Sequence, residues 1–390
     1  MIRFLGPLYA YRFFAELVVI YPLYAVMFLD HGLTPTELSL CLLAWSATAF
    51  VLEVPSGVLA DHLPRKHILW VSEGLKGLGF ACWLAFPTFW GFLAGFVLWG
   101  IKSACHSGCF EALVYDELVA RDHKAAYAKV LGRCRALAAA AIMAASVGAG
   151  ALAGYGYPLL LGVSLAAVAV AMLCALLLPA APPLKSTGET DYLAHLRQGL
   201  TEVAASRRIL WLIAFLAALH AAGGALEEYW PIFGRETGMS GSQIGYALAV
   251  FYAVHAAAAA GAHRLQRWPT SGLLAMLPAM GLLLAAAAAA FQPWAFGLLV
   301  AFNALYVAQA VVFESHLQEA IATRTRATVT SINGLAVQVA CIGVYVCMGP
   351  LAQGLGWRGG FLAAAGAILA AGLALAATRR LARQAAANPA

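Results

Sequence analysis

The sequence predicts an all-α integral membrane protein with twelve transmembrane helices, arranged as two pseudo-symmetric six-helix bundles. Hydrophobic residues make up 63% of the 390 residues and charged residues only 11%, whereas soluble domains carry about 25% charged residues. Apolar runs long enough to cross a bilayer as helices recur along the chain, and the alternating pattern of a membrane β-barrel is absent from the sequence. The two halves of the chain also match each other, which indicates a repeated bundle.

Turn residues and charges divide the chain into its predicted spans. These spans are 4–29, 36–60, 66–87, 89–118, 126–152, 156–178, 208–233, 240–262, 270–290, 293–320, 327–350 and 355–378. The first apolar run is too long for the core of a signal peptide, so it is expected to be a retained span.

Basic residues fix the expected orientation. With a cytoplasmic N-terminus, the inner segments collect seventeen Lys and Arg residues, whereas the outer loops hold only Arg235 and Arg358. This bias predicts that both termini face the cytoplasm. The net charge of +6 therefore reflects topology, and no nucleic-acid partner is expected.

The longest polar stretch separates the two predicted bundles. We expect an N-terminal bundle over 1–178, a cytoplasmic linker over 179–207 and a C-terminal bundle over 208–390. At an offset of 203 residues, Phe110-Glu111 matches Phe313-Glu314, and "YPLY" (21–24) answers "WPIF" (230–233) near the outer ends of spans one and seven. Such matches suggest parallel halves related by an axis along the membrane normal.

The eight cysteines fall almost wholly inside predicted helices and are interpreted as packing residues. Cys105, His106 and Cys109 offer an alternative, because a one-turn spacing places both sulfurs on one helical face where a soft metal could bind. The packing interpretation is preferred, so neither a metal nor a cofactor is expected.

Charge gathers in the loop between the second and third predicted spans, "EVPSGVLADHLPRK" (53–66). Gly57 allows close helix approach, and Asp61 can receive a helix N-terminus or a nearby arginine. Arg65 and Lys66 hold the loop at the cytoplasmic face and can bridge to acidic groups. Ordinary solvated loop charges are the alternative interpretation.

This loop resembles the signature G-x-L-A-D-R-x-G-R-K/R of the major facilitator superfamily, from which it departs at His62 and Pro64. The stretch "SGCFEALVYDEL" (107–118), with "RAT" at 326–328, is similar to a bacterial efflux-like branch of that family. The resemblance implies two bundles that transport by alternating access, with Gly57, Asp61, Arg65 and Lys66 as a cytoplasmic gating motif. It also implies a cavity lined chiefly by spans one, four, seven and ten.

Ionisable residues inside spans cost roughly 2.5–3.5 kcal/mol each and by default mark pathways or paired sites. Arg12 and Glu16 lie one turn apart and can simply pair, and Glu73 with Lys76 is expected to be a self-satisfied pair. Tyr24 and Trp230 are candidates for lining the outer cavity. The candidate substrate and proton pathway consists of Arg12, Glu16, Glu53, Lys102, His106, Glu111, Arg133, His220, Glu227 and Glu314.

These features predict a secondary transporter that moves a small organic solute, as a proton-coupled exporter (antiporter) with Glu16 and then Glu111 as coupling carboxylates. The alternative is a proton-coupled importer of a polar or zwitterionic metabolite or siderophore-like compound, and a third possibility is a non-transporting receptor. The sequence lacks GxxxxGK[ST], HExxH and GxSxG motifs, so an ATP-driven pump and an enzyme are disfavoured. We expect a multi-pass monomer in the inner or plasma membrane, whose partners are a small molecule, protons and the lipid bilayer.

Overall fold

The computed structural model describes residues 2–179, 201–321 and 326–386, except the side chains of 2–3, 54, 57–62, 270, 327 and 379–386. It divides into two compact units, which we call unit 1 (residues 1–186 and 239–252) and unit 2 (187–238 and 253–390). The predicted bundle boundaries remain a prediction, and most of the expected linker lies outside the described residues.

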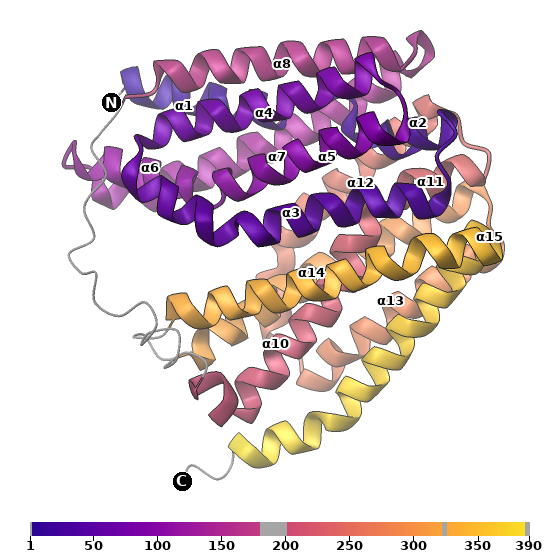
Figure 1. Ribbon diagram of the computed structural model, residues 1–390. Helices are drawn as coiled ribbons and strands as arrows, with labels where there is room; N and C mark the ends of the chain where they lie inside the picture. Colours follow the sequence, from indigo (N-terminus) through magenta and orange to yellow (C-terminus); the bar gives the residue numbers. More distant parts are fainter. Residues whose placement is uncertain (1, 180–200, 322–325, 387–390) are drawn as a thin grey trace. The chain divides into compact units, whose positions relative to one another are not determined.

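Unit 1 is a helical bundle (Figure 1). Its helices are α1 (Ile2–Glu16), α2 (Tyr24–Asp30), α3 (Pro35–His62), α4 (Arg65–Ala85), α5 (Phe89–His106), α6 (Cys109–Val119), α7 (Tyr127–Leu152) and α8 (Tyr157–Leu177). Short 3₁₀ turns lie at Tyr21–Leu23, Lys124–Ala126 and Ala153–Tyr155. Helix α5 packs against α3 and α4, whereas α1 packs against α7 and α8.

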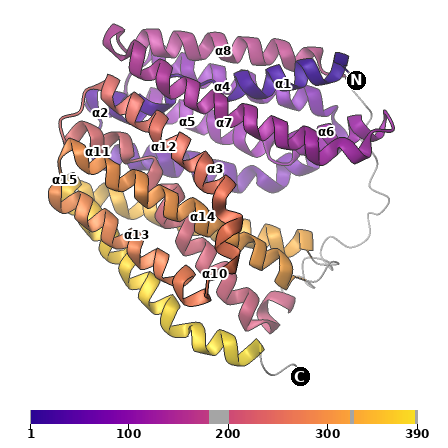
Figure 2. The ribbon, with the colours of Figure 1, turned by 180° about the vertical axis from the view of Figure 1, so that it is seen from behind.

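Unit 2 is also helical, and Figure 2 shows its elements from behind. They are α10 (Arg207–His220), a π-helix (Ala221–Ala225), α11 (Trp230–Glu236), α12 (Gly241–Gly261), a 3₁₀ segment (Ala262–Arg267), α13 (Thr270–Ala290), a 3₁₀ turn (Pro293–Ala295), α14 (Phe296–Ala320) and α15 (Arg326–Ala386). The first part of α12, up to Tyr252, belongs to unit 1. Helix α15 packs against α10 and α13 and bends at Gly356, whose φ is 69°.

Ten helical segments in the described part of the chain are long and apolar enough to cross a membrane. One of them, Thr328–Thr378, runs through the bend at Gly356 and has the length of two spans. The α5–α6 region, predicted as span four, is not among the ten because Lys102 and His106 lower the hydropathy of α5. The described helices are therefore consistent with the twelve predicted spans.

Three predicted spans are not continuous helices. Span one breaks after Glu16 and resumes at Tyr24, and span four breaks at Ser107 and Gly108, whose φ is 67°. Span seven passes through the π-helix Ala221–Ala225 before α11 begins at Trp230. "YPLY" and "WPIF" thus stand where the chain restarts its helix, because proline suits a first helical turn.

Aromatic side chains pack together in the core of unit 1. Phe28 of α2 stacks on Phe92 of α5 with ring centroids 3.9 Å apart, and Trp83 of α4 packs edge-on against Phe28. Gly95 permits this packing, because a Cβ there would lie 2.0 Å from the Trp83 indole nitrogen. Tyr24 and Trp230, suggested as cavity-lining residues, are instead 2% and 0% exposed, because their rings fill the aromatic cores of units 1 and 2.

Candidate functional site

The break in span one is the centre of the candidate site in unit 1. A helix end leaves carbonyl groups without intrahelical partners, and in a membrane they need protein donors. Lys76 Nζ donates to Ala15 O at 2.7 Å, and Ser164 Oγ of α8 accepts from Ile20 N at 3.0 Å. The side chains of α4 and α8 therefore hold the broken backbone in place.

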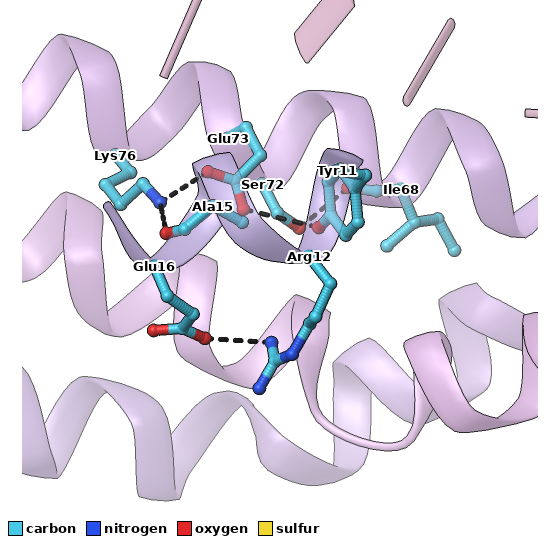
Figure 3. A network of polar contacts seen from close by, with 8 residues as sticks. All are labelled: Tyr11, Arg12, Ala15, Glu16, Ile68, Ser72, Glu73 and Lys76. Atoms are coloured by element: carbon cyan, nitrogen blue, oxygen red, sulfur yellow. Dashed lines mark hydrogen bonds and ion pairs between the residues drawn. The ribbon is translucent and has the colours of Figure 1, made fainter. Parts of the chain in front are cut away.

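A buried network surrounds this break (Figure 3). Lys76 Nζ lies 2.5 Å from Glu73 Oε2, and Tyr11 Oη donates to Glu73 Oε1 at 3.3 Å. The side chains of Lys76 and Glu73 are 1% and 0% exposed, so water does not separate the charges. The expected Glu73–Lys76 pair is confirmed, and it has a further role in bonding the end of α1.

A second ion pair lies on the other side of α1. Arg12 Nη1 lies 2.8 Å from Glu16 Oε1, and the two side chains are 20% and 28% exposed. The Arg12 guanidinium also sits over the ring of Phe110, 5.3 Å from its centroid. Both Lys76 and Lys102 act electrostatically on Glu16. We call Arg12, Glu16, Glu73, Lys76 and Lys102 the charge cluster.

His106, the last residue of α5, lies one turn after Lys102 on the same helical face. Its ring stacks on Phe110 with centroids 5.9 Å apart and an interplanar angle of 9°. The His106 Nε2 atom is buried and has no hydrogen-bond partner among the described residues. Lys102 likewise has no hydrogen bond or ion pair to any described residue, although its side chain is only partly exposed.

In unit 1, the loop 53–66 contacts the stretch 107–118, and these are two of the segments on which the resemblance to the efflux-like branch is based. Ser107 Oγ donates to Glu53 Oε1 at 3.0 Å, and Ser56 Oγ donates to Ala104 O at 2.9 Å. Arg65 Nη1 lies 2.9 Å from Asp116 Oδ2, and both side chains are largely buried. Helix α4 is thereby tied to α6, and α3 to the segment that joins α5 and α6.

Other predicted site residues in unit 1 are more scattered. Glu111 is partly buried in the first turn of α6, where a helix N-terminus favours negative charge. Arg133 is exposed on α7, and Lys66 is partly exposed at the start of α4. Gly57 and Asp61 lie near the end of α3, but their side chains fall outside the described part.

Unit 2 contains a smaller polar group at the end of α10. His220 Nδ1 lies 2.8 Å from Tyr306 Oη, and His220 Nε2 lies 3.2 Å from Glu314 Oε1. The carbonyl of His220 accepts a weak hydrogen bond from Cys341 Sγ at 3.8 Å. Glu227 follows the π-helix and is partly buried. Of the predicted residues of unit 2, the structure therefore joins His220 with Glu314.

Unit 2 also contains an apolar cavity of about 410 Å³ between the α10 and π-helix segment and α15. Ala222, Leu226, Val344 and Met348 are among the residues that line it, and all its lining residues are apolar or cysteine. No group of three or more potential His, Cys, Asp or Glu metal ligands occurs among the described residues. Cys109 is buried, and its Sγ contacts Arg65 O at 3.6 Å.

Sequence reasoning assigned no site role to Tyr11, Ser107 and Asp116. Their partners lie 62, 54 and 51 positions away in the sequence, so helix periodicity could not reveal these contacts. The sequence feature that indicated a buried polar network near Tyr11 was the spacing of Glu73 and Lys76, two opposite charges three positions apart in an apolar helix.

The model of the Major Facilitator Superfamily matches residues 9–344 of the chain. The chain belongs to this superfamily. It is therefore a multi-pass membrane transporter of a small solute and not an enzyme, as the sequence predicted. No match is found among curated proteins.

Solved structures share the fold of this superfamily member at low sequence identity. A point mutant of the nucleoside transporter NupG superposes with a TM-score of 0.81 at 15% identity, over 96% of this chain and 98% of that one. A bacterial homologue of the human lysosomal transporter Spinster, inward-facing and unoccupied, gives 0.66 at 18% identity, over 98% and 94%. A D-xylose–proton symporter gives 0.71 at 14% identity, over 95% of each chain.

Proposed function

We propose that this transporter is a proton-coupled exporter of a small organic solute and that Glu16 carries the coupling proton. The observation that carries the proposal is the contrast between the two ion pairs of the charge cluster. Glu73 and Lys76 are sealed from solvent, whereas Arg12 and Glu16 are 20% and 28% exposed at the point where α1 ends. Of these two pairs, only the second has side chains that reach the molecular surface, so it is the pair that we assign to proton exchange.

In this proposal, alternating access changes the electrostatic surroundings of the Glu16 carboxylate, and that change drives its protonation and deprotonation. In an environment of low dielectric constant a carboxylate favours its neutral, protonated form, and a nearby cation favours its charged form. Arg12 contacts Glu16, and Lys102 acts on it from α5. A small change in the distance of either cation between two states would therefore bind and release a proton. Glu111 is the second candidate for this role.

The experiment begins with the solute, because flux cannot be measured without one. Deletion cells that express the chain are screened for both resistance and uptake across a panel of solutes. Purified protein in liposomes is then given the identified solute and a pH gradient, and flux is expressed per folded molecule. We expect Glu16→Gln to abolish flux driven by the pH gradient while solute binding persists.

A matched control separates coupling from folding. Glu236 forms an exposed ion pair with Arg235 at 2.8 Å, so Glu236→Gln makes the same chemical change away from the charge cluster and should leave flux unaltered. A purely structural Arg12–Glu16 pair would instead lower the yield of folded protein without changing its pH dependence. Unchanged proton-driven flux in both Glu16→Gln and Glu111→Gln would rule out these carboxylates.

The direction of transport rests on the resemblance to the efflux-like branch. The contacts Glu53–Ser107 and Arg65–Asp116 support it, because they join the two motifs that define the resemblance. We assign Gly57, Asp61, Arg65 and Lys66 to a cytoplasmic gate that stabilises one transport state. Export predicts resistance in the cell screen, whereas accumulation of solute would reverse the assignment.

A proton-coupled importer of a polar or zwitterionic solute is the second candidate. One observation favours it: Lys102 is a cation inside a predicted span with no ion-pair partner among the described residues. Such a group suits a polar solute better than a purely lipophilic one. Uptake in the cell screen, with proton influx alongside the solute, would support this candidate over export.

A further inference from the structure

The charge cluster is not neutral. Its three cations are Arg12, Lys76 and Lys102, and its two acids are Glu16 and Glu73. Each acid already has a direct cationic partner, at 2.8 Å for Arg12–Glu16 and 2.5 Å for Lys76–Glu73. One positive charge, that of Lys102, is therefore left without a contacting anion in the described part of unit 1.

The surroundings of Lys102 make this surplus charge costly. Its ammonium is exposed to the repulsion of Lys76 and Arg12, and the nearby carboxylates of Glu73 and Glu16 act on it without direct contact. Charged groups removed from water are paired in stable structures, because an unpaired charge loses its hydration without compensation. A cation inside a span that contacts no anion of the protein can form an ion pair with an anionic ligand.

His106 provides an independent second observation. Its Nε2 atom is buried without a hydrogen-bond partner among the described residues, one helical turn from Lys102. The stacked Phe110 ring fixes the plane of the imidazole, and Phe110 is itself held by Tyr11 and Arg12. Two unsatisfied nitrogens, one cationic and one able to donate as a neutral imidazole N–H, thus share one face of α5.

We propose that Lys102 and His106 bind a carboxylate group of the transported solute, which is therefore a small organic acid or zwitterion. A carboxylate has two acceptor oxygens, so one can accept from Lys102 Nζ and the other from His106 Nε2. The bound anion neutralises the surplus charge of the cluster. This inference rests on the transport of a small solute and names the chemical class of that solute.

The test uses purified full-length protein and pairs of ligands that differ in one group. A panel of carboxylic acids, including benzoate, succinate and amino acids, is compared with the corresponding primary amides, which keep the carbon skeleton and lose the charge. Binding is measured as the shift in melting temperature, followed by titration of the acids that bind. We expect one or more acids to raise the melting temperature by several degrees, and their amides to have little effect.

Variants at the two residues assign the binding to this site. Lys102→Gln is expected to abolish the acid-specific shift, Lys102→Arg to retain it, and His106→Leu to weaken acid binding about tenfold, as expected for loss of one hydrogen bond. Lys129→Met, which removes an exposed lysine of α7, should leave binding unchanged. If Lys102→Gln proves unstable, the loss in His106→Leu and retention in Lys102→Arg still test the assignment.

Several results would overturn the inference. They are equal binding of acids and amides, no stabilisation by any acid of the panel, or acid-specific binding that persists in Lys102→Gln. Failure of the proposed coupling is a different result: carboxylate binding would depend on Lys102, while Glu16→Gln left proton-driven flux intact.

Discussion

Replacing Lys76 with methionine is expected to destabilise unit 1 far more than a typical surface substitution. The Lys76 ammonium contacts Glu73 Oε2 at 2.5 Å and Ala15 O at 2.7 Å, and neither side chain of the ion pair is more than 1% exposed. Removing one partner of a buried ion pair costs roughly 3–5 kcal/mol. A buried carbonyl left without a donor costs roughly 1–3 kcal/mol more.

The two losses share one ammonium group and overlap, so we expect the free energy of unfolding of Lys76→Met to fall by about 4–6 kcal/mol. For a domain of about 150–250 residues, 1 kcal/mol shifts the melting temperature by roughly 2–4 °C. The melting temperature of the variant should therefore fall by roughly 8–24 °C. Intrinsic tryptophan fluorescence of the purified protein during heating measures this change.

A double-mutant cycle tests the physical reason. Glu73→Gln alone should also be strongly destabilising, but the double variant Lys76→Met/Glu73→Gln leaves no uncompensated charge and should recover much of the loss. Lys129→Met, on the exposed face of α7, is the control for removing a lysine. A shift below about 2 °C for Lys76→Met, or strictly additive losses in the double variant, would refute the reasoning.

Further predictions concern topology, the gate, packing and coupling. A reporter fused after Ala390 should lie in the cytoplasm and one inserted near Gly238 should lie outside, and finding both on one side would end the twelve-span assignment. Arg65→Gln, which breaks an ion pair of 2.9 Å, should slow turnover and leave solute affinity within a few-fold, whereas a collapse of affinity in binding assays would contradict a gating role. Gly95→Ala places a methyl group 2.0 Å from the indole nitrogen of α4, so overpacking should lower stability by roughly 1–3 kcal/mol, which an unchanged melting temperature would disprove. For export, we expect protons and the carboxylate solute to compete, so that acidification weakens carboxylate binding. Binding that strengthens on acidification in the wild type, but not in Glu16→Gln, would instead indicate co-transport with protons and import.

The sequence predicted the class of fold because its signals are strong and local. Apolar runs and the distribution of Lys and Arg follow from the bilayer itself, and the match between the halves adds the repeat that is typical of transporter folds. Helix continuity was less predictable. The hydropathy of "FFAELVVIYPL" stays high through the break after Glu16, because the bonds that replace the helix come from Lys76 and Ser164, on helices distant in the sequence.

The sequence indicated which residues belong to the candidate site, but it did not show all of the pairs that they form. Ionisable residues inside apolar spans stand out, so Arg12, Glu16 and Lys102 were identified as candidates from the sequence alone. Pairs within one turn, such as Arg12 and Glu16, also follow from helix geometry. The isolation of Lys102 could not be inferred, because it depends on both neighbouring acids being bonded to other cations.

The two halves repeat the interruption of their first helix but not its chemistry. Helix α1 ends at Glu16 and α10 at His220, positions that agree to within one residue at the internal offset of 203. At that offset, the counterparts of the five residues in the charge cluster are Phe215, Leu219, Met276, Ala279 and Leu305. The break in unit 2 has different partners: the π-helix, a weak bond from Cys341 Sγ to His220 O, and the contacts of the His220 ring with Tyr306 and Glu314. In unit 1, Lys76 and Glu73 stabilise the break, but Lys102 contacts neither the broken backbone nor an anion among the described residues. Such a costly charge inside a span is expected where a charged ligand or proton is handled. Substitutions that change charge selectivity should accordingly concentrate in unit 1, and Lys102→Leu, which introduces the residue found at its counterpart Leu305, should remove selectivity for acids before it removes the fold.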